Sequence, residues 1–429
     1  MFDEAARRAE VARRADAAHE FRAGWRLLIP TTLGVALGFP TLAIFTLGIF
    51  APELARDFHW SYSQIMAGTM IVTLASFVAG PFVGSLSDRV GVQRVAIIST
   101  VLLGLSFMGF ALSTGSLPQY YATWLLMSFL GAGTAQVVWT RTIHQHFDAG
   151  RGLAIGITLA GVGIFTLLGK PLASLIVTHA GWRMAYAVIG LLPLLLVVPA
   201  SLWGLKARPG TQVANSTAAV VAAQGLTFRQ AIRTRHFWLF VAAFPLLAIA
   251  LTGIISNVEI ILLSHHFSKA MVLTIVPWMG LTIAAGRLFG GFLADLLWAP
   301  LIASILLCVA AGVCFMLAQS EIGYWTAVVA MLLVGTTIGV EIDLTSYLVA
   351  RYLGVKHYGQ LYGILYSFIA FGGGLGPSCF GWAYDRWGSY SLVLRMAGGG
   401  LVLSAALLLL LGPYTNFKAT QCDGSSDAH

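Results

Sequence analysis

Two charged residues stand deep inside long apolar stretches of this chain. Arg287 lies eight residues before Asp295, roughly 12 Å along a helix, and Glu341 lies ten residues before Arg351, roughly 15 Å. An ionisable group at such a depth in a bilayer costs several kcal/mol unless it is paired or faces water, which makes it a candidate for function. A buried guanidinium matches a carboxylate through two parallel hydrogen bonds. We therefore expect Arg287 to bind a carboxylate.

Two acidic residues at a similar depth are candidates to oppose this arginine. We expect Glu341, or Asp343 close by, to compete for Arg287 when no ligand is bound. Removal from water favours the neutral form of a carboxyl group, so either residue is also a candidate to carry a proton. The alternative is a permanent salt bridge between two helices, which would be purely structural.

Other side chains in the apolar stretches are candidates to line a binding cavity. Tyr362 and Tyr366 are four residues apart and share one helix face, and Tyr366 is the deeper of the two. Gln136 and Trp139 are expected on the opposite side of the cavity. Arg141 is a candidate for a second anion contact. For the aromatic residues the alternative is packing, and for Arg141 it is a gate salt bridge or a side chain that snorkels to the membrane surface.

Lys170 is the remaining basic residue of these stretches. It lies 19 residues after Arg151, roughly 28 Å along a helix and close to the outer surface. A lysine there usually extends to water, and the functional alternative is an outer vestibule that attracts anions. Glu259, at the outer end of its own stretch, is expected to be solvated.

The composition identifies a polytopic membrane protein. Of the 429 residues, 58% are hydrophobic and only 10% are charged, which is too few charges to cover a soluble protein of this length. Four cysteines form no metal-binding or disulfide pattern, and no phosphate-binding loop, metalloprotease or nucleophile-elbow motif occurs. We therefore expect no enzyme, no cofactor or metal, and no nucleic-acid partner.

About 20 apolar residues span a bilayer, and twelve such segments follow one another along the chain. This predicts an all-α membrane protein of two pseudo-symmetric six-helix bundles. The expected parts are a cytoplasmic segment, the first bundle, a cytoplasmic linker with a short helix, the second bundle and a cytoplasmic tail, at 1–24, 25–205, 206–235, 236–412 and 413–429. The expected spans are 25–51, 63–85, 95–115, 120–146, 152–178, 183–205, 236–262, 271–295, 300–320, 323–350, 359–383 and 389–412.

Lysine and arginine are concentrated in the segments that share a side with both ends of the chain. Because basic residues stay on the cytoplasmic side, both termini are expected in the cytoplasm. The arginine- and alanine-rich composition suggests a bacterial inner membrane.

The chain repeats itself with an offset of 207 residues. Gly84 maps onto Gly291 and Asp88 onto Asp295, each pair closing an apolar segment. A chain that repeats in halves inside lipid is typical of two bundles that rock around a shared cavity, which is the architecture of a transporter.

The first copy of the repeat resembles the signature loop between the second and third spans of the major facilitator superfamily. The matching residues are Gly84, Leu86, Asp88, Arg89, Gly91 and Arg94. The resemblance covers about 25–412 and implies an inner gate formed by Asp88, Arg89, Arg94 and Asp148. The second copy, which ends at Asp295, lacks the basic tail, so its gate is expected to be weaker or to use Arg351.

Within the superfamily the chain resembles the monocarboxylate-porter and oxalate/formate-antiporter group, through the segments 151–156 and 181–186 and through Arg287 with Gly291. In that group the arginine of the eighth span binds the substrate carboxylate, and the resemblance implies this role for Arg287. The chain departs from the group in having Ile283 one turn before this arginine and no lysine or arginine in 359–383.

Together these features predict a secondary transporter that moves a small organic anion, a monocarboxylate in particular, by proton symport or anion exchange. The expected partners are this anion, a proton or counter-anion and the lipid bilayer, and the expected state is a monomer. The alternative is a carrier of the same fold for an uncharged or cationic solute of the drug, sugar or amino-acid type.

Overall fold

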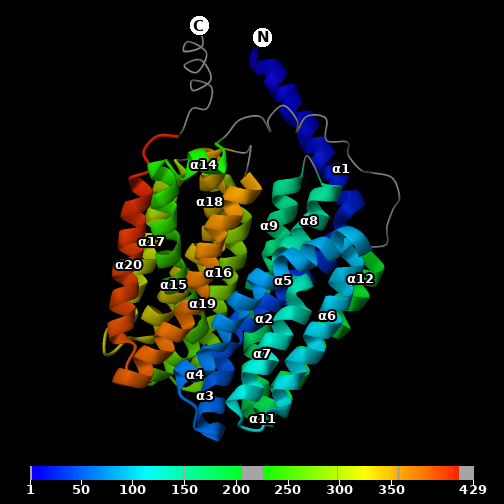
Figure 1. The fold of residues 1–429 in the computed structure, drawn as a ribbon. Coiled ribbons are helices and arrows are strands. Elements are labelled where there is room, and N and C mark those ends of the chain that lie inside the picture. Colours follow the sequence, from blue (N-terminus) through cyan, green and yellow to red (C-terminus); the bar gives the residue numbers. More distant parts are fainter. Residues whose placement is uncertain (1, 148–149, 205–225, 297, 355–357, 415–429) are drawn as a thin grey trace.

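The computed structural model describes residues 2–147, 150–204, 226–296, 298–354 and 358–414. Within these ranges the chain forms two helical bundles that stand side by side (Figure 1). We call the end where α1 begins and α20 ends the terminal end, and the opposite end the distal end.

The N-terminal bundle is built from helices that are repeatedly interrupted. They are α1 (Phe2–Ala36), α2 (Phe39–Phe45), α3 (Leu47–Phe58), α4 (Tyr62–Met66), α5 (Gly68–Val90), α6 (Val92–Gly109), α7 (Leu117–Gly131), α8 (Gln136–His146), α9 (Arg151–Leu159), α10 (Gly161–Ile164), α11 (Lys170–Leu192) and α12 (Val198–Gly204). Short 3₁₀ turns lie at η1 (Phe110–Leu112) and η2 (Ala132–Thr134), and π turns lie at η3 (Phe165–Gly169) and η4 (Pro193–Val197).

The C-terminal bundle consists mainly of long continuous helices. They are α15 (Arg235–Ser264), α16 (Lys269–Leu296), α17 (Ala299–Leu317), α18 (Tyr324–Leu353), α19 (Tyr358–Trp387) and α20 (Ser391–Leu409). The short helix α14 (Phe228–Ala231) precedes them and begins with a capping box between Thr227 and Gln230. The amide of Leu226 ties this segment to the carbonyl of Leu353 at 3.0 Å.

Twelve membrane crossings follow from eleven apolar helical stretches. One stretch, Gly152–Gly204, has 53 residues, which is more than twice the length of a single span. It doubles back at Gly181, where φ is 80° and ψ is 166°, a conformation that glycine adopts readily. Both of its ends, α9 and α12, contact α1, as a chain that returns must. The expected all-α fold with twelve spans is therefore confirmed.

The first span of the N-terminal bundle is broken at the level where the fourth span is also broken. α1 ends before Gly38, and α2 restarts with Pro40 in its first turn. The amide of Phe39 donates to Thr134 Oγ1 of η2 at 2.9 Å, and the indole of Trp139 donates to the Thr134 carbonyl at 3.1 Å. Thr134 of the fourth span thus satisfies a backbone amide at the first break, and Trp139 satisfies a backbone carbonyl at the break of its own span, as irregular backbone at membrane depth requires.

Glycines bring the two bundles into backbone contact along α10, η3 and α16. A Cβ atom on Gly163 would lie 2.5 Å from the carbonyl oxygen of Gly280, and one on Gly280 would lie 2.7 Å from that of Gly163. Small residues let helices approach this closely in lipid, where packing supplies most of the association energy.

At the distal end, a carboxylate of one bundle caps a helix of the other. Asp385 of α19 accepts hydrogen bonds from the amides of Tyr62 and Ser63, the first residues of α4, at 2.8 and 2.7 Å. These amides have no partner within their own helix, and the helix N-terminus favours negative charge. Farther in, the hydroxyl of Thr69 donates to the carbonyl of Gly374 at 2.9 Å.

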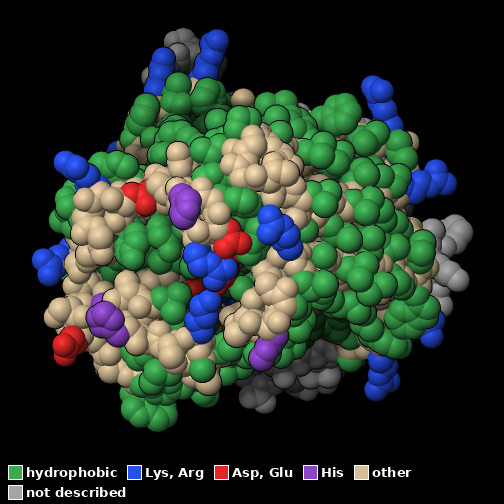
Figure 2. All heavy atoms as spheres, turned by 90° about the horizontal axis from the view of Figure 1, so that it is seen from below, with side chains coloured by type: hydrophobic (Ala, Val, Ile, Leu, Met, Phe, Trp, Pro, Cys, Tyr) green, Lys and Arg blue, Asp and Glu red, His purple; other side chains and the backbone are tan. Residues whose placement is uncertain are grey.

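Side chains cover the distal face, and basic and acidic groups gather near its middle (Figure 2). Ion pairs at this end join Glu53 of α3 to Arg56 at 2.9 Å and to Lys269 of the other bundle at 2.6 Å. The two bundles are thus held together at their distal ends in this conformation.

We predict that Gly163→Ala lowers the melting temperature of the purified protein, because its methyl group collides with backbone that cannot rotate away. Overpacking of this kind typically costs about 1–3 kcal/mol. Gly152→Ala is the matched control, since nothing lies within 4 Å of a Cβ at this position. Replacing glycine by alanine in a helix gains about 0.5–1 kcal/mol, so the control should unfold at the same or a slightly higher temperature. Equal melting temperatures for the two variants would contradict the close contact.

Candidate functional site

Arg287 lies inside the protein rather than toward lipid, with only 3% of its surface exposed. Its helix, α16, packs along α18 through glycines, and a Cβ on Gly286 would lie 3.1 Å from the Cα of Gly339. From the other bundle, Gly156 of α9 approaches the backbone of this residue, and a Cβ there would lie 3.2 Å from the Arg287 carbonyl oxygen. The backbone of Arg287 therefore lies at the interface where the two bundles meet, and its side chain is buried.

Tyr366 of α19 lies within electrostatic range of both Arg287 and Glu341. α18 separates its helix from α16, because α18 packs against both. The tyrosine side chain is 47% exposed, in contrast to the buried arginine. The structure therefore brings three of the expected site residues into one region of the C-terminal bundle, with the tyrosine as its accessible member.

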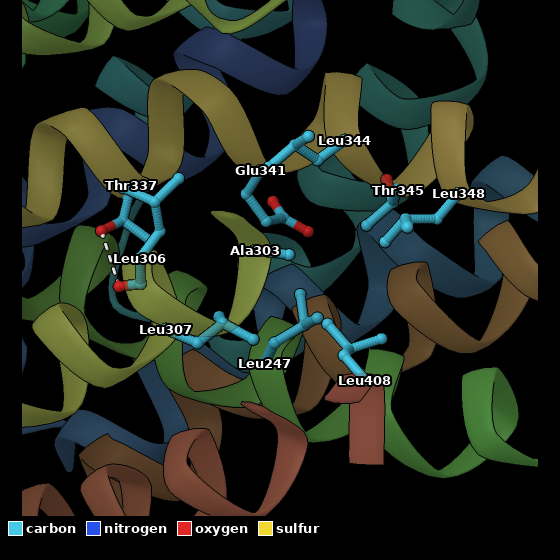
Figure 3. A pocket seen from close by; sticks show the side chains of 10 residues that line it. All are labelled: Leu247, Ala303, Leu306, Leu307, Thr337, Glu341, Leu344, Thr345, Leu348 and Leu408. Atoms are coloured by element: carbon cyan, nitrogen blue, oxygen red, sulfur yellow. Dashed lines mark hydrogen bonds between the residues drawn. The ribbon is translucent and has the colours of Figure 1, made fainter. Parts of the chain in front are cut away.

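Glu341 points into a small cavity of about 10 Å³, which is about the room that one water molecule needs. Figure 3 shows its carboxylate directed toward Ala303 of α17, with leucines of α15, α18 and α20 around it. Thr337 and Thr345 are the other polar residues of the lining. The rest of the lining is apolar, so a charged carboxylate is costly there unless it is paired.

The residues expected on the N-terminal side of the site are not equally placed. Gln136 is half-buried at the start of α8 and Arg141 is exposed. Trp139 is only 1% exposed, and its ring fills the space against Gly34 of α1. With its N–H bonded to Thr134, the indole joins two helices, so the expectation that it lines a binding cavity is wrong for this conformation.

Lys170 and Glu259 differ most from what their positions along the chain indicate. We expected the lysine to reach water or to line an outer vestibule, and the glutamate to be solvated. Instead, Lys170 Nζ and Glu259 Oε1 lie 2.5 Å apart, with the side chains 2% and 8% exposed. Both expectations are corrected: the two residues form a buried ion pair between the bundles, because each helix turns its charged side chain toward the other.

The expected gate is described only in part. Arg89 and Arg94 flank Gly91 at the terminal end and are exposed. The guanidinium of Arg351 donates to the hydroxyl of Tyr347 at 2.9 and 3.0 Å and lies over the rings of Tyr347 and Tyr414, all in its own bundle. Four expected residues have side chains outside the described part of the chain. They are the gate residues Asp88, Asp148 and Asp295 and the proton-carrier candidate Asp343.

Asp385 was missed in the sequence. It sits at the end of an expected span, where a lone carboxylate is usually solvated, and its acceptor role depends on the start of a helix some 320 residues earlier in the chain. The available signal was the pair Ser61 and Gln64, a capping box that marks the start of α4.

One carboxyl group outside the spans has a perturbed acidity. The indole of Trp182 donates to Asp57 Oδ2 at 2.7 Å, and this hydrogen bond holds the pKa of Asp57 below its usual value. The contact fastens the end of α3 to the turn at Gly181. Within the described residues, no group of three or more His, Cys, Asp or Glu side chains is arranged to hold a metal ion.

Comparison with known proteins adds to this geometry. A family model described as Major Facilitator Superfamily matches residues 33–377. An uncharacterized 38 kDa protein of Thermoproteus tenax is 30% identical over 375 residues, covering 87% of this chain and 92% of that protein. Human monocarboxylate transporter 11 is 26% identical over 411 residues, covering 90% and 83%. The uncharacterized MFS-type transporter YhjX of Escherichia coli is 22% identical over 366 residues, covering 83% and 87%.

The family match covers most of the chain, from the first span into the eleventh. It agrees with the twelve crossings, the two bundles and the glycine contacts between them. The chain is therefore a multi-pass membrane protein and belongs to the Major Facilitator Superfamily, a family of transporters rather than enzymes.

Proposed function

We propose that this protein is a secondary active transporter of a small organic anion, with a monocarboxylate as the preferred substrate class. Arg287 carries the proposal, because it is a permanently charged group buried at the interface of two bundles. Burial of such a charge costs free energy, so a buried arginine in a membrane protein is a candidate for a functional role. A carboxylate that binds in two parallel hydrogen bonds is the partner that suits a guanidinium best.

The surroundings of Arg287 support a substrate path. Tyr366 is accessible and lies within electrostatic range of Arg287 and Glu341, and its hydroxyl is the proposed donor to an anion that approaches the arginine. Arg141 is exposed on the facing bundle, and Gln136 lies near the break of the fourth span. These residues come from both bundles, as substrate sites of rocking-bundle carriers do.

The distal closure supports alternating access. Because the distal ends are joined by Asp385, Glu53 and Lys269, a substrate would reach Arg287 from the terminal end in this conformation. From the excess of basic residues in the terminal segments, we propose that this end faces the cytoplasm. Transport then requires these distal contacts to break while new contacts form among the gate residues of the terminal end.

Glu341 is the proposed proton carrier beside the substrate. Its carboxylate faces an apolar cavity of the C-terminal bundle, and both Glu341 and Arg287 lie within electrostatic range of Tyr366. Binding of an anion at Arg287 and of a proton at Glu341 would leave the site with little net charge to move through the membrane. Asp343 remains the second candidate, and exchange of one anion for another is the alternative coupling.

The similarity to human monocarboxylate transporter 11 favours a monocarboxylate as the substrate. The second candidate function is a carrier of the same fold for an uncharged or cationic solute. A cation carrier would need acidic groups in the cavity without the arginine beside them. The distinction can be tested with a panel of small carboxylates, amino acids and sugars.

We predict that Arg287→Lys abolishes uptake of small carboxylates into proteoliposomes, because a point charge cannot replace the planar fork. Loss of one bidentate, charge-assisted contact is expected to reduce uptake by about tenfold to a hundredfold or more. In parallel, carboxylates that raise the melting temperature of the wild-type protein should no longer do so in the variant.

Gly152→Ala serves as the control with unchanged uptake, and the expression of the arginine variant should equal that of wild type. Uptake at the full rate by Arg287→Lys would exclude the carboxylate assignment. Thermal stabilisation by amines or sugars, with none by carboxylates, would favour the second candidate function.

We predict that Glu341→Gln uncouples transport from a proton gradient while exchange of labelled anion across the membrane continues. The amide keeps the shape of the protonated carboxyl but cannot release a proton. The measurement compares accumulation driven by an inward proton gradient with exchange at equal pH on both sides.

Thr345→Val, which alters another polar residue of the same cavity, is the matched control and should remain coupled. If the gradient still drives accumulation in Glu341→Gln, the proton does not travel on this residue, and Asp343→Asn becomes the next variant to measure.

A further inference from the structure

The ion pair of Lys170 and Glu259 crosses the boundary between the bundles. Lys170 starts α11 in the N-terminal bundle, and Glu259 lies in the last third of α15 in the C-terminal bundle. The two charged atoms are 2.5 Å apart, and hardly any of either side chain is exposed. The other ion pair between the bundles, Lys269 with Glu53, is different in kind, because its lysine is 51% exposed.

The surroundings leave the pair short of hydrogen bonds. Lys170 has three N–H donors and a contact with one carboxylate oxygen, and the ring of Phe45 lies 6.0 Å from its nitrogen. Glu259 Oε2 and the hydroxyl of Ser256 are buried without a hydrogen-bond partner among the described residues. The attraction within such a pair offsets little of the free energy that its desolvation costs. The paired and the separated states of the two charges are therefore close in free energy.

Two local features place these charges together. The π turn η3 immediately precedes Lys170 and adds a residue to the helix, which rotates the following side chains by about 100°. Pro171 lacks the amide that would close a regular α-turn at this point. On the other side, Gly48 of α3 makes room for the carboxylate, because a Cβ there would collide with Glu259 Oε2.

The neighbouring elements carry several charged and titratable groups on their distal parts. They are Glu53, Arg56 and Asp57 on α3, Lys269 on α16, Tyr384, Asp385 and Arg386 on α19 and Tyr390 at the start of α20. The hydroxyl of Tyr390 donates to Asn257, and Glu53 and Asp385 have the partners described above. Within the described chain, Lys170 is thus the ionic partner of Glu259.

We propose that Glu259 is a proton-binding site that controls the distal closure of the carrier. When the bundles part at this end, water reaches both charges, and Glu259 takes a proton from the distal solution while Lys170 keeps its own. The neutral carboxyl can no longer balance the ammonium, and reclosing would bury an unpaired charge. Protonation therefore holds the distal end open, and release of the proton lets it close.

This site is separate from the proton carrier beside the substrate. Glu341 lines a cavity inside the C-terminal bundle, whereas Glu259 lies on the surface that must separate during transport. The inference rests on the proposed function only in requiring alternating access. It does not depend on which solute is carried, so it can be measured without substrate.

The experiment measures the separation of the distal ends by pulsed electron spin resonance in lipid nanodiscs. Spin labels at Ser116, before α7, and at Ser320, after α17, report on opposite bundles in a full-length chain whose native cysteines are replaced by alanine. For the wild type, we expect one short distance at about pH 8 and a growing population of longer distances as the pH is lowered to about 5.

Two variants separate a proton site from a structural contact. Glu259→Gln leaves the ammonium without a carboxylate and should show the longer distance at both pH values, with the ratio of closed to open molecules lowered about a hundredfold or more. Lys170→Gln/Glu259→Gln removes both charges and should remain closed at both pH values, which also shows that the altered site folds. Glu53→Gln alters a different distal contact and Glu341→Gln alters the proposed proton carrier, and in both variants the separation should still respond to pH.

A wild-type separation that does not change with pH would overturn the proposal. So would a titration that persists in Lys170→Gln/Glu259→Gln, because the response would then belong to other distal groups such as Asp385. A titration lost in Glu341→Gln would assign the proton to the substrate site instead. These outcomes can be interpreted even if the protein does not transport carboxylates, because no substrate is present in the measurement.

Discussion

The cost of holding charge away from water is the constraint on which the rest of this structure depends. Arg287 and Lys170 are both almost fully buried in a protein whose surroundings are lipid. Each stands where one bundle meets the other, rather than in the interior of a bundle. A charge at such a boundary changes its environment whenever the bundles move, so its burial cost becomes coupled to the position of the bundles.

The two bundles share an ancestry of sequence but are built differently. The first and fourth spans of the N-terminal bundle are broken at a common level and joined by Thr134 and Trp139. The corresponding spans of the C-terminal bundle, α15 and α18, are continuous helices of 30 residues each. The ionisable groups of the proposed substrate site, Arg287 and Glu341, are carried by the continuous helices.

The distal closure combines interactions of different strength. Backbone contacts between glycines set how near the bundles can come, and they respond to no ligand. Asp385 adds a cap that is accessible to water, where charge is screened. The ion pair of Lys170 and Glu259 is sealed from water, so its protonation state matters most. The same closure thus contains a fixed part and a part that a proton can change.

Depth along the membrane was determined by the sequence alone, because the rise of a helix is constant and the apolar segments have clear ends. The twelve spans, the repeat of 207 residues and the depth of Arg287 in the membrane all follow from position along the chain. The direction in which each side chain points around its helix axis was decided only by the tertiary structure. A π turn rotates Lys170 toward a glutamate 89 residues later in the chain, and Gly34 receives the ring of Trp139. Neighbours across a bundle interface are distant in sequence, so no local pattern specifies which of them a side chain meets.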